Sequence, residues 1–232
     1  GFYRAASGAL GYEVVLKTND TFDLYRVDST TTIPSGCSNT QNETGWGTWG
    51  VNTRTLLGTY SFPTNGLLFF EDHVFVRGQI NTAKLMIVAA RLPDSESTRR
   101  NISITNDILY TNYDGQDVLG LIAQNNVNIG MASEDDLRID AALIAQQGRV
   151  GRYYYPEPSW SSNRCSPYHT RNSLTLWGMI ATNGRYGFAW TDGNGYDTRT
   201  ISYDGSLLYN PPPSTPLTSD QYYPLSWEEI EQ

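Results

Sequence analysis

The chain has 232 residues, of which 17% are charged and 12% aromatic, and its formal net charge is −8. This length allows one large domain with a substantial core, and a composition rich in Thr, Ser, Asn and Gly favours strands and turns over helices. The acidic balance argues against nucleic-acid binding, which needs clustered Lys and Arg. No run of apolar residues is long enough to cross a membrane.

Residues 1–17 are the first predicted element. Ala5, Ala6, Ala9 and Leu10 favour a helix, although the apolar residues of this stretch do not form a clean helical stripe. We therefore expect a short N-terminal helix. The sequence begins without Met and without a signal peptide, and we interpret it as a processed or truncated product whose targeting segment has been removed.

Residues 18–65 form a polar, loop-rich insert that we expect to cap the main body. Trp46 and Trp49 of this insert are expected to pack over the body rather than to form a ligand platform. Cys37 and Cys165 lie in polar, loop-like sequence without zinc-binding spacing. This setting favours a disulfide between them in an oxidising compartment, and two unrelated loop thiols are the alternative.

Residues 66–209 carry a succession of short alternating or apolar stretches, each ended by Gly, Asn or Asp. One phrase recurs as LIAQNNVNIG at 121–130, LIAQQGRVGR at 143–152 and MIATNGRYGF at 179–188. The step from the first copy to the second is 22 residues, close to one coil of a parallel β-helix, and the longer second step contains an obvious loop. We predict an all-β fold with a right-handed parallel β-helix (a solenoid) over 66–209, in preference to a sandwich or a barrel.

Two earlier stretches, MIVAARLPD at 86–94 and ILYTNYDG at 108–115, look like looser copies of the same coil. In each full copy we expect the Ala to face inward near a corner and the polar residues after it to form the turn. Residues 210–232 leave the body, and four prolines within 211–216 enforce an extended segment. We expect this Pro-rich tail to lie along the body and cover apolar surface, and a binding motif for another protein is the alternative.

Several stretches resemble the solenoid domains of bacterial type IV pilus-associated, prepilin-like surface proteins. They are the LIA coils, RTISYDGSLLYNPPPSTP at 199–216 and YPLSWEEI at 223–230. YRAASGALGYEVVL at 3–16, with its A-x-x-G pattern, is similar to the segment that comes after the transmembrane part of the prepilin helix. The resemblance implies an extracellular protein at the cell surface whose partners are pilus or surface-assembly proteins. It also implies that the chain reaches the membrane only through a missing upstream helix.

No catalytic residue is assigned, because the sequence has no G-x-S-x-G elbow, P-loop or dinucleotide fingerprint. Parallel β-helices that act on polysaccharides use several carboxylates on one face, and a solvated turn is the preferred interpretation of the acidic run 134–136. His73 and His169 are not favoured as metal ligands or general bases. The carboxylates considered are Asp107, Asp114, Asp117, Glu134, Asp135, Asp136 and Asp140.

Aromatic and calcium-type residues are the remaining candidates for a site. Sugar faces stack on exposed rings, which makes Tyr153, Tyr154, Tyr155, Trp160 and Trp190 the candidate ligand-facing aromatics. The stretch TDGNGYD at 191–197 has the composition of a calcium loop but lacks the Glu of an EF-hand, so it is interpreted first as a turn. Its oxygen-bearing candidates for calcium are Asp192, Asn194 and Asp197. No other cofactor is expected.

The sequence leaves two functions from different classes. The first is a non-enzymatic cell-surface protein, linked to a type IV pilus-like system and acting in adhesion, filament assembly or uptake. The second is a carbohydrate-active β-helix, either a glycan-binding module or a polysaccharide-degrading enzyme.

Overall fold

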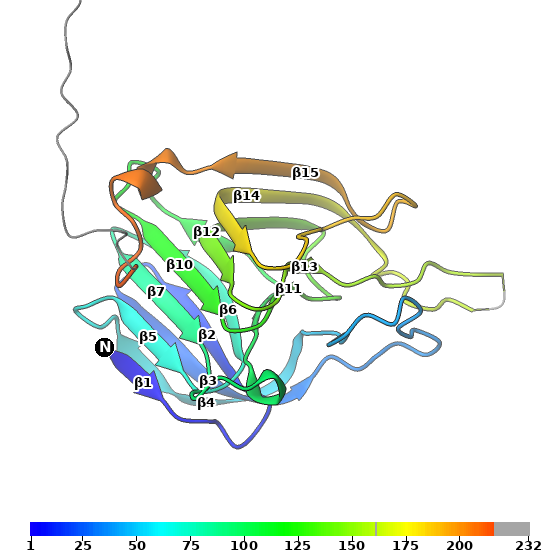
Figure 1. The fold of residues 1–232 in the computed structure, drawn as a ribbon, viewed down its shortest axis with the longest axis horizontal. Coiled ribbons are helices and arrows are strands. Elements are labelled where there is room, and N and C mark those ends of the chain that lie inside the picture. The colour runs from blue at the N-terminus through cyan, green and yellow to red at the C-terminus, as the bar shows by residue number, and fades with distance from the viewer. Residues whose placement is uncertain (161, 216–232) are drawn as a thin grey trace, which may run out of the picture.

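The computed structural model describes residues 1–160 and 162–215, and nearly all of the regular structure there is β-strand (Figure 1). The all-β prediction is confirmed. The described part also has two short 3-10 turns, η1 (Glu96–Thr98) and η2 (Gly205–Leu208), and it has no helix that is long and apolar enough to span a membrane. The strands are β1 (Phe2–Arg4), β2 (Tyr12–Lys17), β3 (Thr21–Thr30), β4 (Val51–Ser61), β5 (Leu67–Phe70), β6 (Val74–Ile80), β7 (Lys84–Ala89), β8 (Ile102–Ile104), β9 (Ile108–Tyr110), β10 (Val118–Ala123), β11 (Val127–Ile129), β12 (Asp136–Ala145), β13 (Val150–Arg152), β14 (Thr170–Thr182) and β15 (Gly195–Tyr203).

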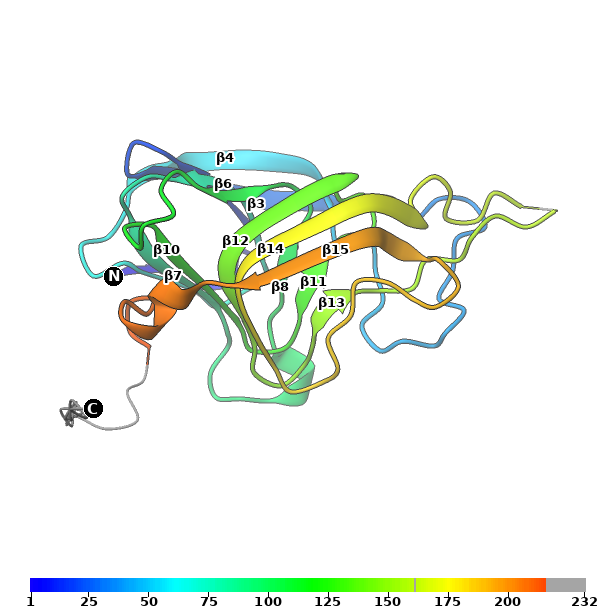
Figure 2. The same ribbon diagram turned by 90° about the horizontal axis from the view of Figure 1, so that it is seen from above.

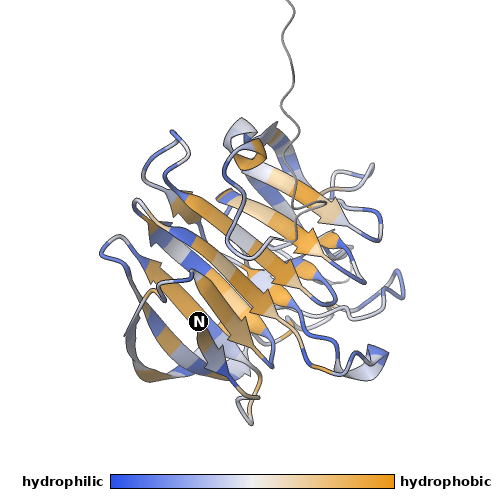
Figure 3. Cartoon of the chain, turned by 60° about the vertical axis from the view of Figure 1, so that its left-hand side comes forward, coloured by the Kyte–Doolittle hydropathy of each residue, from blue (hydrophilic) through white to orange (hydrophobic). Residues whose placement is uncertain are grey.

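One face of the body is a parallel ladder that runs β1, β5, β7, β10, β12 and β14. Its register places Leu68, Ile87, Leu121 and Leu143 opposite one another on successive strands, and all four are fully buried. Figure 3 shows these strands as the most apolar part of the chain. Near-continuous apolar runs are typical of parallel strands, and stacking them buries one side chain against the next.

The other strands form two further sets. β3 is antiparallel to both β2 and β4, and β2 continues into a parallel series with β6, β9, β12, β14 and β15. β8, β11 and β13 form a short parallel set, in which β8 also pairs with the start of β6. β12 and β14 are long enough to take part in two sets, and Figure 2 shows them curving from one to the other. The core lies between these sets.

The repeated sequence motif corresponds to a structural repeat, but the third copy is shifted by one residue in its strand register. Leu121 pairs with Leu143 and Ala123 with Ala145, as the first two copies predict. In the third copy Ile180, not Met179, lies opposite Leu143. Leu174 and Leu176 of the same strand are buried, so period-two alternation turns Ile180 toward the core and Met179 outward, where it packs with Leu207.

The two looser copies differ in outcome. Ile87 of the 86–94 stretch pairs with Leu121, so this stretch belongs to the same ladder. The 108–115 stretch does not, because Ile108 pairs with Gly78 and Ile139 in the second set of strands. That part of the prediction is wrong, since copies of one coil position should stack on one face.

The predicted N-terminal helix is not present. Residues 2–4 are strand β1 and residues 12–17 are strand β2, joined by a loop. Val14 and Leu16 are buried in the core, whereas Val15 and Lys17 are only half-buried, and this alternation is the period of a strand. Tertiary pairing with β3 and β6 therefore outweighs the helix propensity of the alanines.

The 18–65 region is more regular than a polar insert. It contributes β3 and β4, which extend the sheet beyond β2, and only residues 31–50 between them form a long loop. In the tail, Asn210 accepts a hydrogen bond from Lys84 Nζ at 2.8 Å and donates to the Gly115 carbonyl at 2.6 Å. The tail therefore begins against the body, and the rest of the predicted covering segment, residues 216–232, lies outside the described residues.

Candidate functional site

Long loops at one end of the body are joined by a disulfide. Cys37 in the 31–50 loop and Cys165 in the 153–169 loop form the bond across a sequence separation of 128, which confirms the predicted pairing. Figure 1 shows these loops extending together beyond the same end of the strands. We call this region, with the 183–194 loop beside it, the loop end.

A buried arginine fastens the loop end to the strands. Arg152 of β13 is fully buried, and its guanidinium donates to the carbonyls of Gly130, Met131 and Tyr168. The guanidinium carbon lies 4.8 Å from the centroid of the Tyr155 ring. Burial lowers the pKa of the guanidinium, because it removes the positive charge from water. The carbonyl dipoles and the aromatic face stabilise this charge in place of water. The loop end is thus held by polar contacts that exclude water.

A cleft of about 650 Å³ opens in the loop end, between the 31–50 and 183–194 loops. We call it the aromatic cleft. Its lining combines aromatic rings with two arginines and one carboxylate, a mixture suited to a ligand with both apolar and polar faces. The lining groups that carry chemistry are Glu43, Arg149, Tyr153, Arg185, Tyr186 and Trp190.

One part of the cleft lining is fixed by an ion pair. Glu43 Oε1 accepts a hydrogen bond from Arg149 Nη2 at 2.8 Å, and Oε2 accepts one from the backbone N–H of Tyr154 at 2.7 Å. The Arg149 guanidinium carbon also lies 4.9 Å from the centroid of the Tyr153 ring. Both charges are therefore partnered, and this part of the cleft is preorganised.

Trp190 is held edge-to-face against Tyr154, with ring centroids 5.5 Å apart. The Tyr154 hydroxyl donates to Asp192 Oδ2 at 2.8 Å. Burial and this hydrogen bond raise the pKa of Tyr154 to about 12, so the phenol remains a donor at neutral pH. Trp190 is half-buried, so its ring has a set orientation and still offers surface to the cleft.

Arg185 and Tyr186 were not identified from the sequence. Both are exposed, and the Arg185 side chain has no hydrogen bond or ion pair within residues 1–160 and 162–215. A signal was present in the repeat. Gly187 bridges to Gly151, so Tyr186 lies where the second copy carries the buried Val150. A large exposed ring at a position that is aliphatic in the preceding coil indicates a surface role.

The candidate aromatics do not form one surface. Tyr153 and Tyr155 are 1% and 0% exposed, because the loop end folds over them, and their rings are not open to a ligand. Tyr154 and Trp190 are half-buried and contact each other, and Trp190 lines the cleft. Trp160 is 99% exposed and is not part of the cleft lining.

The calcium candidates are engaged in hydrogen bonds. Asp192 accepts from Tyr154 through Oδ2 and from the backbone of Asn194 through Oδ1. The buried amide of Asn194 exchanges hydrogen bonds with the backbone of Tyr155, and Asp197 is exposed on β15. No group of three or more His, Cys, Asp or Glu in the described part of the chain could hold a metal ion.

Most of the predicted carboxylates have structural partners. Asp135 pairs with Arg171, and Asp136 accepts from the Ser173 hydroxyl at 2.5 Å, so the acidic run, whose three residues are exposed, also joins β12 to β14. Asp117 is buried and accepts backbone N–H groups, and Asp114 is exposed.

Asp107 and Glu134 also have partners, since Asp107 Oδ1 accepts from the backbone N–H of Arg138 at 2.7 Å and Glu134 Oε1 accepts from Asn106 Nδ2 at 2.8 Å. Burial raises the pKa of Asp107, the hydrogen bond from Arg138 opposes this, and the neighbouring Glu134 and Asp140 raise it further. Asp140 itself is buried and accepts from the Tyr110 backbone at 3.0 Å and the Tyr113 hydroxyl at 2.7 Å. Two neighbouring carboxyl groups, one of them with a raised pKa, are a feature of acid–base sites.

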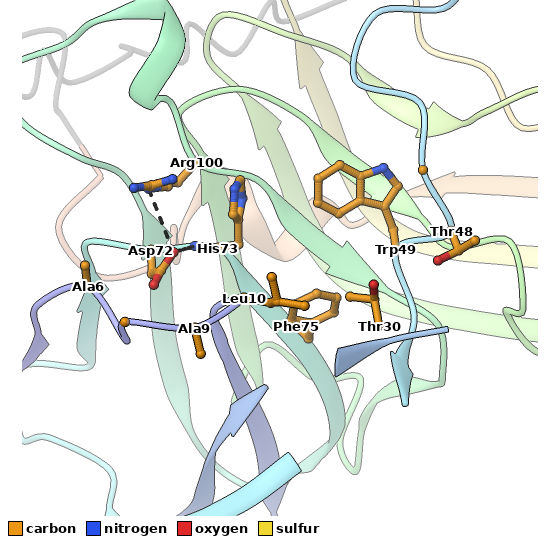
Figure 4. Close-up of a pocket in the computed structure, with 12 residues that line it drawn as sticks. Ala6, Ala9, Leu10, Thr30, Thr48, Trp49, Asp72, His73, Phe75 and Arg100 are labelled. Carbon is orange, nitrogen blue, oxygen red and sulfur yellow. Dashed lines mark hydrogen bonds and ion pairs between the residues drawn. The ribbon is translucent and has the colours of Figure 1, made fainter. Parts of the chain in front are cut away.

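His73 and Trp49 line a second cavity of about 490 Å³, beside the loop that joins β1 to β2 (Figure 4). We call it the Trp49 pocket, and it shares no lining residue with the aromatic cleft. Trp46 packs against Tyr155 as the sequence predicted, whereas Trp49 also faces this pocket. His169 is half-buried and lies apart from His73, at the loop end.

Comparison with protein-family models, curated proteins and solved structures finds no match to this chain. The chemistry of its own cavities and loops is therefore the basis on which its function can be inferred.

Proposed function

We propose that this chain is a non-enzymatic cell-surface protein that binds a glycan in the aromatic cleft and acts in adhesion, as part of a type IV pilus-like system. The proposal rests on one observation. The exposed Tyr186 and the half-buried Trp190 line the cleft together with Arg185, whose charge has no partner in the described residues. Filament assembly and uptake are further roles of such surface proteins, and a glycan site favours adhesion among the three.

The ligand class is inferred from these side chains. An aromatic face packs against the C–H face of a sugar ring, and a guanidinium forms charge-assisted hydrogen bonds with a carboxylate. Arg149 is neutralised by Glu43, which leaves Arg185 as the group that would recognise negative charge. The chain as a whole is acidic and would repel a highly charged polymer. We therefore expect an oligosaccharide with isolated acidic sugars, such as uronates.

Binding of a uronate-containing oligosaccharide and of its neutral, reduced-carboxyl counterpart, measured by calorimetry, tests this expectation. Trp190→Ala should weaken binding of both sugars by about tenfold or more, because the stacking face is lost. Arg185→Gln should weaken binding of the acidic sugar alone, since only the carboxylate contact is removed. Trp160→Ala is the matched control, because Trp160 is fully exposed and outside the cleft.

These measurements distinguish a glycan site in the cleft from a site elsewhere and from no glycan site. Loss of binding in Trp160→Ala with full binding in Trp190→Ala would move the site out of the cleft. No binding of either sugar to the wild-type protein at millimolar concentration would overturn the glycan proposal.

We also propose that the body is a right-handed parallel β-helix. The order in which the chain visits the three sets of strands supports this winding. β7, β8 and β9 are followed by β10, β11 and the first half of β12, and each strand stacks on its counterpart one coil earlier. Right-handedness is the usual chirality of crossovers between parallel strands. An experimental structure tests it, and a left-handed or sandwich-like winding would refute it.

A cell-surface location is supported by the disulfide, since such bonds persist in oxidising compartments. The pilus link rests on the resemblance of the coils and of residues 3–16 to prepilin-like proteins. A membrane-impermeant biotin reagent applied to intact cells tests the location. The gene sequence upstream of Gly1 tests the link, which requires a prepilin cleavage site and about 20 apolar residues there.

A polysaccharide-degrading enzyme is the second candidate, and the Asp107–Glu134 pair favours it. Burial raises the pKa of Asp107, which makes this carboxyl the candidate general acid, and Glu134 is the second carboxyl group beside it. Release of reducing ends from acidic polysaccharides, abolished in Asp107→Asn and kept in the exposed control Asp114→Asn, would support this candidate. Such turnover would also contradict the non-enzymatic proposal.

A further inference from the structure

The Trp49 pocket has an apolar part and a polar part (Figure 4). Leu10 and Phe75 form the apolar floor, and the Trp49 indole stands beside the His73 ring, with centroids 5.7 Å apart. Asp72, His73 and Arg100 lie together at the other side in Figure 4. A pocket of this size with a few convergent polar groups is typical of a small-molecule site.

Trp49 has an unusual backbone for a residue of its kind. Its φ of 48° lies in the left-handed region, which residues other than Gly, Asn and Asp seldom adopt. The indole N–H is bonded to the Gly45 carbonyl at 3.1 Å, so its polar edge is satisfied by the 31–50 loop. This backbone conformation places the ring where it packs against the buried cluster of the loop end and also lines the pocket.

The carboxylate of the pocket is already satisfied. Asp72 Oδ2 accepts from the backbone N–H and the hydroxyl of Ser7 at 2.8 and 2.6 Å, and Oδ1 accepts from the backbone N–H of His73 at 2.8 Å. These bonds tie the β1–β2 loop to the turn before β6. Asp72 therefore has little capacity left for a ligand.

Arg100, unlike Asp72, lacks hydrogen-bond partners for its charged group in the part of the chain that the structure describes. Its nearest ionic partner is Asp72, with Nε 3.9 Å from Oδ1, which is beyond hydrogen-bond distance. Within the described residues its guanidinium makes no hydrogen bond, and its buried Nε has no partner. A largely buried arginine without hydrogen-bond acceptors favours the binding of a ligand with an anionic oxygen, because unmade hydrogen bonds of a charged group are costly.

His73 supplies a neutral donor beside it. Its Nδ1 accepts the backbone N–H of Asn101 at 3.0 Å, which fixes the proton of the neutral ring on Nε2. Burial, with Arg100 nearby, lowers the pKa of His73 to about 4 and outweighs the opposite influence of Asp72. At neutral pH the ring is uncharged, and Nε2 has no hydrogen-bond partner in the described part of the chain.

We infer that the Trp49 pocket binds a small apolar carboxylic acid, whose carboxylate is held by Arg100 and His73 Nε2 and whose hydrocarbon part packs on Trp49, Leu10 and Phe75. This site is separate from the proposed glycan site. Either can be wrong without affecting the other.

A matched pair of probes tests the inference: 3-phenylpropionate and its uncharged analogue 3-phenylpropionamide, titrated into the wild-type protein and followed by NMR. The acid should bind about tenfold more tightly than the amide, because the charge-assisted contact is made only by the carboxylate. Arg100→Gln should reduce the affinity for the acid to that for the amide and leave the amide unchanged. Arg91→Gln is the matched control, an exposed arginine of the same connection that lies outside the pocket.

Equal binding of acid and amide to the wild-type protein would overturn the inference, as would no binding of either at about 10 mM, which is weaker than small-molecule sites usually bind. An equal loss in Arg91→Gln would do the same. If Arg100→Gln does not fold, Arg100→Lys and the preference of the wild-type protein for acid over amide decide the question. Trp190→Ala should bind 3-phenylpropionate normally, and a loss there would contradict the separation of the two sites.

Discussion

The stacked ladder and the loop end are stabilised in different ways. In the ladder, Leu121 and Leu143 repeat the same side chain at the same depth, and each strand pairs with its neighbour in register. In the loop end, Cys37 is bonded to Cys165, and Arg152 donates to carbonyls of separate segments. The ladder depends on many equivalent apolar contacts between paired strands, whereas the loop end combines a separate aromatic cluster around Tyr153 and Tyr155 with specific polar and covalent contacts.

This difference has a consequence for function. Loops on a rigid scaffold are where binding residues concentrate, and the aromatic cleft lies in the loop end. Because the described residues of its loops form no paired strands, the loop end should open with a lower free energy than the ladder does. A destabilising substitution should therefore raise the rate of amide hydrogen exchange first in the region that carries it.

The largest effect is expected from removal of the disulfide. Closure of a loop of 128 residues stabilises by at most about 5 kcal/mol in the chain-entropy model. The double variant Cys37→Ser/Cys165→Ser should lose a large part of that stability and bind glycan more weakly. Hydrogen exchange should rise first in residues 31–50 and 153–169. An equal rise throughout β7, β10 and β12 would show that the two regions unfold as one.

Leu143→Ala should destabilise the ladder by about 3 kcal/mol, since it removes buried methyl groups from a packed stack. Here exchange should rise across β10, β12 and β14 rather than in the loop end. Leu56→Ala, in β4, is the matched control, because Leu56 is exposed and should change the free energy of unfolding by less than about 0.5 kcal/mol. Urea unfolding measures both, and equal losses in the two variants would contradict the assignment of Leu143 to the core.

Much of the ladder could be predicted from the sequence because its signal is local and repeated. The period of 22 residues gave the register of Leu121 with Leu143, and the polar setting of the two cysteines gave the disulfide. The third copy failed by one residue because sequence identity suggested Met179, while the alternation set by Leu174 decided the orientation. Alignment of identical residues is therefore a weaker guide to side-chain orientation than the two-residue period of a strand.

The N-terminal strands and the two cavities could not be predicted in the same way. Ala5 and Ala6 carry a helix propensity that pairing of the flanking segments with β5, β3 and β6 overrides, and that pairing is not visible locally. The Trp49 pocket joins residues as far apart as Leu10 and Arg100, and the aromatic cleft joins Glu43 to Trp190. Such juxtapositions depend on how the coils stack, which a single sequence does not reveal.

Arg152→Met tests whether the loop end depends on the buried guanidinium. Methionine fills much of the same volume but removes a donor to the Gly130 and Tyr168 carbonyls and leaves Met131 the longer hydrogen bond from Arg171, so we expect a loss of about 2–3 kcal/mol. Exchange should rise in residues 153–169 as it does without the disulfide. Arg26→Met is the control, because Arg26 forms only an exposed ion pair with Asp28. An Arg152→Met variant with an unchanged free energy of unfolding would mean that apolar packing alone holds the loop end.

The smallest effect belongs to His73 and appears only on acidification. Its pKa is lowered from 6.5 to about 4 in the folded chain, chiefly by burial and then by Arg100, while Asp72 acts in the opposite direction. Between those two pH values the unfolded chain binds a proton that the folded chain does not, so stability falls as the pH falls. Allowing for partial exposure, we expect His73 to account for about 2 kcal/mol of the loss between pH 7 and pH 4. His73→Asn preserves an acceptor for the Asn101 N–H and cannot titrate, so its free energy of unfolding should decline less over this range. Parallel pH profiles for the two proteins would show that the pKa of His73 is not lowered in the folded state and that burial of its ring does not favour the neutral form.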